Sequence, residues 1–145
     1  MANNSSAESW QRATVLPSER GSSRLVTDDL LEQLGIFGWS QEDIFAIHLA
    51  AEEALVNAAM HGNRFDPAKQ VHVECQVSND LVRLVVTDEG EGFDSANVPD
   101  CTLAERLEST NGRGVKLMRS FMTRVEYNPK GNRVILEKKR ETAQP

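Results

Sequence analysis

Residues 52–63 form the stretch of sequence that decides the fold. They read Glu52-Glu53-Ala54-Leu55-Val56-Asn57-Ala58-Ala59-Met60-His61-Gly62-Asn63. Upstream, Ser40 precedes Gln41, Glu42 and Asp43, and a serine followed by an acid in the third helical position is typical of a capped helix start. The sequence therefore predicts one helix that begins after Ser40 and runs to about Gly62.

Two different sides of this helix are expected to be covered. At about 100° per residue, one aliphatic stripe contains Ile44, Ile47, Ala51, Ala54, Leu55 and Ala58. Glu53 and Asn57 lie on the other side, in line with small Ala46 and Ala50. Glu52 is turned about 100° away from Glu53 and is expected at the surface.

Glu53 and Asn57 are one helical turn apart, so both side chains can enter one pocket from a rigid element. A carboxylate suits a base, and an amide oxygen suits Mg²⁺, which prefers oxygen ligands and keeps several waters. An ordinary solvated helix face would also carry such a pair. His61 and Gly62 likewise fit either a site or a plain helix end with an imidazole and a glycine cap.

Two glycine-containing segments follow. Asp88-Glu89-Gly90-Glu91-Gly92-Phe93 comes directly after an apolar strand; its acid can accept a hydrogen bond from an amine such as that of adenine, and its glycines allow close approach of a ring. A surface turn is the simpler alternative. A calcium loop is excluded, because Pro99 occupies the position that needs a bidentate Glu.

Asn111-Gly112-Arg113-Gly114 precedes a helix expected from Val115 to Phe121. Free backbone N–H groups and the positive end of a helix dipole form an anion site there. The segment matches neither the Walker pattern nor a Rossmann fingerprint.

The remaining segments predict the rest of the fold. A short strand at 13–16, a helix at 19–34, a hairpin at 71–77 and 81–86, and a second hairpin at 124–127 and 133–137 give the order β, α, α, β, β, α, β, β. We expect an α+β two-layer sandwich, with helices on one face of a mixed, mostly antiparallel sheet. Residues 1–12 are expected to be a disordered tail, 13–139 one domain and 140–145 a second tail.

Composition limits the function classes. The chain has 145 residues and a net charge of −6, and its basic residues are spread among acids, so nucleic-acid binding is not expected. Cys75 and Cys101 lack a CxxC partner and fit a reducing compartment. Without an apolar leader or membrane-length segment, the protein is expected in the cytoplasm.

Taken together, the three motifs resemble the GHKL ATPase superfamily, and within it the small anti-sigma-factor serine kinases of the RsbW and SpoIIAB type. The N-box pattern ExxxN with a His-Gly end is matched by residues 53–57 and 61–62, and the DxGxGF box by residues 88–93. The third box is matched by Gly112-Arg113-Gly114, with Leu117 and Met118 behind it. The resemblance covers about residues 13–139.

The resemblance implies a Bergerat-type ATP fold with residues 94–111 as the ATP lid. It implies that Glu53 orients or deprotonates the attacking hydroxyl, Asn57 ligates Mg²⁺ and Asp88 contacts the adenine amine. The nucleotide-contacting set that it implies is Asn57, His61, Gly62, Asp88, Gly90, Gly92, Phe93, Gly112, Arg113, Gly114, Val115 and Asn132. Many relatives carry Thr where Asn132 stands, and Asn can still form a hydrogen bond.

The function implied is that of an ATP-dependent serine kinase in a partner switch. Such a kinase is a homodimer that binds a sigma factor or phosphorylates a serine of a STAS-type anti-anti-sigma antagonist. A nucleotide-gated, non-catalytic protein that sequesters its partner is the main alternative. A histidine-kinase fragment lacks a separate phosphoacceptor helix, because His48 lies within the N-box helix, and an α+β domain without a nucleotide site is the remaining alternative.

Overall fold

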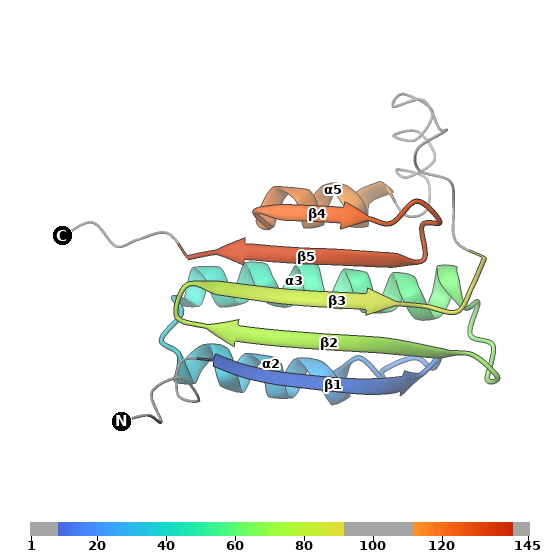
Figure 1. Ribbon diagram of the computed structural model, residues 1–145, viewed down its shortest axis with the longest axis horizontal. Helices are drawn as coiled ribbons and strands as arrows, with labels where there is room; N and C mark the ends of the chain where they lie inside the picture. Colours follow the sequence, from blue (N-terminus) through green and yellow to red (C-terminus); the bar gives the residue numbers. More distant parts are fainter. Residues whose placement is uncertain (1–8, 92–111, 141–145) are drawn as a thin grey trace.

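Five strands form one sheet in the order β1-β2-β3-β5-β4 (Figure 1). The computed structural model describes residues 9–91 and 112–140. The strands are β1 (Ser9–Pro17), β2 (Gln70–Ser78), β3 (Leu81–Thr87), β4 (Arg124–Tyr127) and β5 (Arg133–Lys139). Every pairing between these strands is antiparallel. The sequence predicted a mixed, mostly antiparallel sheet, whereas the described sheet is entirely antiparallel.

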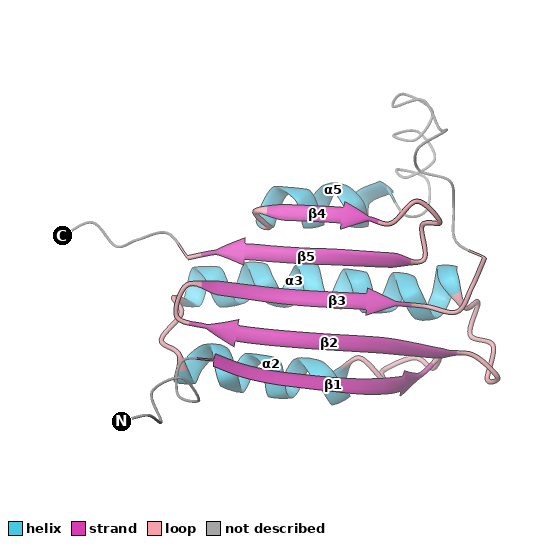
Figure 2. Cartoon of the chain, in the orientation of Figure 1, coloured by secondary structure: helices cyan, strands magenta, loops and turns pink. Residues whose placement is uncertain are grey.

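The helices all lie behind one face of this sheet (Figure 2). They are α2 (Arg24–Ile36), α3 (Gln41–Val56), the π-helix η1 (Asn57–Gly62) that continues α3, and α5 (Gly112–Phe121). This arrangement confirms the predicted α+β sandwich and the predicted order of elements. Within residues 9–91 and 112–140, no helix is both long enough and apolar enough to cross a membrane.

Both predicted tails are partly wrong. β1 begins at Ser9, which pairs with Ser78, so residues 9–12 belong to the sheet because an edge position on β2 is open to them. Arg140 is also anchored: its backbone N–H donates to Asp80 O at 2.9 Å, and its guanidinium lies 5.5 Å from the Trp39 ring. Residues 1–8 and 141–145 lie outside the described ranges.

The boundaries of α2 also differ from the prediction. The helix begins at Arg24, because Gly21 adopts a φ of 82° in the preceding turn. It continues past Gly35 to Ile36, and Gly38, just after the C-cap Phe37, has a φ of 76°. Trp39 N–H donates to Leu34 O and Gly38 N–H to Gly35 O, both at 3.0 Å, which is the pattern of a Schellman cap.

The core lies between the helices and one face of the sheet. Alternate residues of β2 and β3, including Val73, Cys75 and Leu84, point toward the helices and are buried. Burial raises the pKa of the Cys75 thiol to about 12, as expected for a small core residue. Cys101 lies outside the described ranges.

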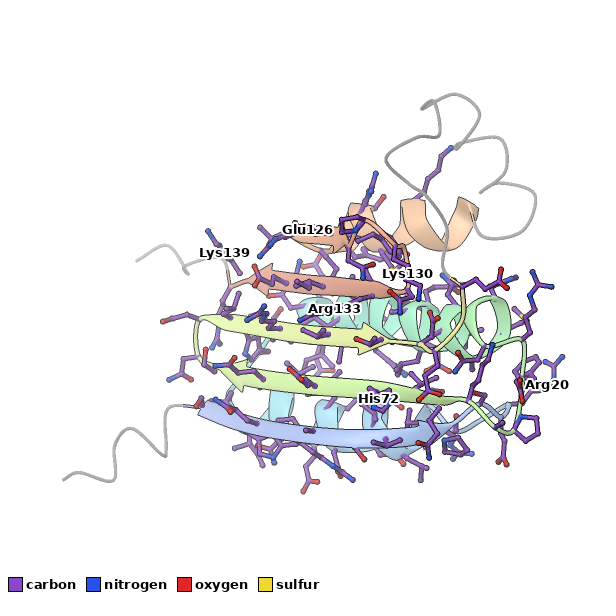
Figure 3. The ribbon with its side chains drawn as sticks, turned by 45° about the vertical axis from the view of Figure 1, so that its right-hand side comes forward. Arg20, His72, Glu126, Lys130, Arg133 and Lys139 are labelled. Carbon is purple, nitrogen blue, oxygen red and sulfur yellow. The ribbon has the colours of Figure 1, made fainter. Side chains whose placement is uncertain are left out.

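The opposite face of the sheet carries charge. His72, Thr87 and Arg133 occupy one row across β2, β3 and β5. Figure 3 labels His72 and Arg133 on this face, together with Glu126 and Lys139. The core therefore lies on the helix side of the sheet. The Asp88 loop lies at the end of the sheet where β3 ends.

Candidate functional site

Glu53 and Asn57 lie at the junction of α3 and η1. Ser40 caps α3, accepting the Asp43 N–H at 3.0 Å, which confirms the predicted helix start. Asn57 N–H donates to Glu53 O and Ala54 O, and both site side chains are half-buried. Ala46 and Ala50, on the same side of the helix, are buried, and α5 packs against α3. Both sides of α3 are therefore covered, as expected.

Glu52 differs from its prediction as a surface residue. It is half-buried, and Ser23 Oγ, at the start of α2, donates to Glu52 Oε2 at 2.9 Å. The two adjacent acids therefore have different surroundings. Glu52 links α3 to the start of α2 through this hydrogen bond, whereas Glu53 lies on the side of α3 that carries Asn57.

The segment that contains His61 and Gly62 is a π-helix and not the last turn of an α-helix. Asn63 N–H donates to Ala58 O at 2.8 Å, a bond that spans five residues. π-Turns are rare and occur often at functional sites. Burial lowers the pKa of His61, which favours the neutral imidazole, and the charge of Glu53 opposes this shift.

The wide turn brings Gly62 against the loop that follows β3. A Cβ built on Gly62 would lie 2.3 Å from Asp88 Oδ2, and one on Gly90 would lie 1.9 Å from Gly62 O. Neither position has room for a side chain. The structure therefore brings together Gly62, Asp88 and Gly90, which the sequence placed in two separate motifs.

Asp88 is the most buried acid of this cluster, with 8% of its surface exposed. Its Oδ1 accepts the Gly90 N–H at 2.8 Å, and no residue of the described ranges donates to Oδ2. Burial raises the pKa of the carboxyl group, while the Gly90 hydrogen bond and the charges of Lys130 and Lys69 act in the opposite direction. Figure 3 shows Lys130 at the end of the sheet where β5 begins.

Asn132 holds the same loop from the side of β5. The Asn132 side-chain Nδ2 donates to the backbone oxygen of Asp88 at 2.9 Å. The backbone oxygen of Asn132 accepts the Asp88 N–H at 2.8 Å. Asn128 Nδ2 donates to Asn132 Oδ1 at 2.9 Å. Asn132 thus contacts Asp88 directly and fixes the backbone of that acid.

The start of α5 differs from its prediction. Gly112 is the first helical residue, so Gly112-Arg113-Gly114-Val115 forms the first turn of the helix and not a loop that precedes it. The first N–H groups of a helix have no partner within the helix, so an anion site here would use them directly. Gly92, Phe93 and the expected lid at 94–111 lie outside the described ranges.

Two residues of this site were missed by sequence reasoning. Tyr127 points inward from β4; burial raises its pKa to about 12, the charges of Asp88 and Glu53 contribute to the same direction, and Arg119 opposes them. Tyr127 packs against the hydrophobic core beneath the sheet. Asn63, with 1% exposure, joins η1 to the Asp88 loop through the hydrogen bond from Glu89 N–H to its Oδ1. Period-two alternation along residues 124–127 is a signal that could have placed Tyr127 on the inner face, whereas nothing local marked Asn63.

The donor set limits what could hold a metal ion. Among the described residues, no group of three or more His, Cys, Asp or Glu side chains could bind one. Asn57 supplies one amide oxygen on the side of Glu53, which fits an ion that takes most of its ligands from water and phosphate. The site therefore fits a nucleotide-bound Mg²⁺ better than a dedicated protein cage.

Comparison with known families agrees with this fold and with the order of the motifs. A model of the histidine kinase-like ATPase domain matches residues 16–138. The chain belongs to this family of ATPase domains, which confirms the resemblance drawn from the three motifs.

Particular relatives narrow the similarity. The chain is 33% identical over 107 residues to the anti-sigma F factor of Clostridium perfringens, an alignment that covers 70% of this chain and 76% of the relative. It is 35% identical over 104 residues to the anti-sigma F factor of Geobacillus thermodenitrificans, with 67% and 70% covered. The anti-sigma F factor of Oceanobacillus iheyensis is 30% identical over 90 residues, with 60% and 61% covered.

Proposed function

We propose that this protein is an ATP-dependent serine kinase that acts as an anti-sigma regulatory factor in the cytoplasm. In this proposal a homodimer binds a sigma factor and phosphorylates a serine of a STAS-type anti-anti-sigma antagonist. The observation that carries the proposal is the packing of Gly62, Asp88 and Gly90 at the end of η1, the helix segment that begins at Asn57, one turn after Glu53. The similarity to anti-sigma F factors supports the choice of partner.

Base recognition falls to Asp88. Its Oδ2 accepts the exocyclic amine of adenine, while Oδ1 remains bound to Gly90 N–H. Gly62 and Gly90 have no side chains that would separate the base from this carboxylate. A charged acceptor in a buried position makes such a bond stronger than a neutral, exposed one.

Phosphoryl transfer falls to the residues of α3, η1 and α5. Glu53 accepts the proton of the substrate's serine hydroxyl while the serine oxygen bonds to the γ-phosphorus of ATP. The bond from that phosphorus to the β–γ bridging oxygen breaks, and ADP leaves. Asn57 would hold Mg²⁺ through its amide oxygen, and the ion would neutralise charge on the phosphates. The N–H groups of the first turn of α5 face the phosphates.

The adjacent acids provide a matched test. Purified protein is incubated with γ-labelled ATP and the antagonist captured from the native cell, and phosphoserine is mapped by mass spectrometry. Glu53→Gln is expected to lower the transfer rate about 100-fold or more while ATP still binds. Glu52→Gln, which alters the hydrogen bond to Ser23, is expected to leave the rate near that of the wild type.

Four outcomes would contradict parts of this proposal. Equal rates for wild type and Glu53→Gln would remove the role of Glu53. ATP-dependent partner binding without any phosphoserine would identify a nucleotide-gated, non-catalytic protein. Absence of Mg²⁺-dependent ATP binding in calorimetry would exclude both, and a monomer by analytical ultracentrifugation would exclude the dimer.

A further inference from the structure

Asn63 is a buried amide at the point where three separate segments meet η1. It follows Gly62 directly, and only 1% of its surface is exposed. Burying an unpartnered amide costs free energy comparable to one or more hydrogen bonds, so the partners of Asn63 decide what it contributes.

The Asn63 amide bonds on both its donor and its acceptor side. Nδ2 donates to Ser18 Oγ at 2.8 Å and to Gln70 O at 3.0 Å. Oδ1 accepts the Glu89 N–H at 2.7 Å. The side chain thus joins the segment after β1, the start of β2 and the loop after β3 to the end of η1.

The bond to Glu89 acts on the residue next to Asp88. From the other side, Asn132 bonds to both the N–H and the C=O of Asp88. The side chain of Glu89 is held too, because its Oε2 lies 2.8 Å from His72 Nε2. The short loop from Asp88 to Gly90 is therefore fixed between β5 and η1.

We propose that Asn63 is a positioning residue for base recognition. By holding Glu89 N–H against the end of η1, it keeps Asp88 Oδ2 directed at the amine of the base and keeps Gly90 against Gly62. This inference rests on the proposed binding of ATP. It assigns adenine selectivity to a residue outside the three motifs that does not touch the nucleotide.

The selectivity ratio separates positioning from general stability. The two ligands are ATP and purine riboside triphosphate, which lacks only the exocyclic amine. The wild type is expected to bind ATP about tenfold more tightly or better, because one hydrogen bond to a charged acceptor is lost with the analogue. A residue that merely stabilises the fold would affect both ligands equally.

Asn63→Ala is expected to weaken ATP binding about tenfold and to bring the ratio of the two dissociation constants near one. Ser18→Ala is the matched control, since Ser18 is similarly buried and belongs to the same network through Asn63 Nδ2 and Lys69 O. It leaves the Glu89 bond in place. It is therefore expected to lower the melting temperature while the ratio stays at the wild-type value.

The outcomes separate the failure of the proposed function from the failure of this inference. A wild type that does not bind ATP overturns the proposed function and this inference with it. A wild type that distinguishes the two ligands, together with a folded Asn63→Ala variant of unchanged ratio, overturns the inference alone. So does a ratio lost to the same extent in Ser18→Ala.

A second measurement applies if Asn63→Ala does not fold. Amide hydrogen exchange of the wild type and of Ser18→Ala, followed by NMR, reports directly on the Glu89 N–H. Slow exchange of this amide in both proteins supports the hydrogen bond by which Asn63 Oδ1 holds the Glu89 N–H. Exchange at the rate of an unprotected peptide amide overturns it.

Discussion

Gly90→Ala tests the contact between the two glycine motifs. The added Cβ would lie 1.9 Å from Gly62 O and 2.6 Å from Gly62 C, whereas real Cβ atoms essentially never approach a neighbour closer than 3.0 Å. The obstructing atoms belong to the backbone of η1 and cannot rotate away. The loop must therefore move by about 1 Å, and it carries Asp88 with it.

The expected cost has two parts. Overpacking of a well-packed site costs about 1–3 kcal/mol, which for a domain of this size lowers the melting temperature by about 3–10 °C. A displaced Asp88 would also lose the proposed hydrogen bond to the base, which costs about 1.5–3 kcal/mol and weakens ATP binding about 10- to 100-fold.

Differential scanning fluorimetry and calorimetry with ATP measure the two parts. Gly35→Ala is the matched control: Gly35 lies in α2, and a Cβ there would meet no atom within 4 Å. Alanine is the better helix former, so this variant is expected to melt at a higher temperature and bind ATP normally. If Gly90→Ala behaved like Gly35→Ala in either measurement, the close packing of Gly62 and Gly90 would be refuted.

Two further predictions concern charge and backbone strain. In the proposed binding mode the ionised carboxylate of Asp88 accepts the adenine amine, and burial raises the pKa of this group. Affinity for ATP is therefore expected to fall as the pH decreases through that pKa. The Asp88→Asn variant should bind ATP weakly and lack this pH dependence. If calorimetry showed a wild-type affinity that stays constant as the pH decreases, Asp88 would not be the acceptor of the adenine amine. Arg64 is exposed and adopts a φ of 54°, a conformation that costs a non-glycine residue about 1–2 kcal/mol. Arg64→Gly is therefore expected to raise the melting temperature by a few degrees, whereas Arg64→Ala, which keeps the Cβ, is not; a lower melting temperature for Arg64→Gly would show that the turn is not strained.

Local patterns predicted most of the fold correctly. Ser40 marked the start of α3 because a cap acts within one turn, and period-two alternation placed both hairpins because it records which face of a strand is buried. The predicted boundaries are wrong where the structure of a segment depends on a partner far away in the sequence. Three of residues 9–12 are polar, yet the segment forms part of β1, because β2 offers it hydrogen bonds and Trp10 packs against the core.

The candidate site shows the same division. The spacing of Glu53 and Asn57, and the order of the glycine motifs, are properties of the sequence and were sufficient to indicate the family. The π-turn of η1 was not predictable, since its residues would suit an α-helix equally well. The hydrogen bond of Glu52 to Ser23 likewise depends on how α2 packs against α3.

The sequence by itself determined which residue types were present and which short elements carry them: an acid and an amide on one helix, and glycines after a strand and before another helix. Only the tertiary structure decided that Gly62 meets Gly90 and that Asp88 is buried between Asn63 and Asn132. Helix caps and strand alternation depend on neighbours within a few residues. The bonds that fix Asp88 and Glu89 join residues 44 and 26 positions apart, and such contacts arise only when the packed sheet and helices bring their ends together.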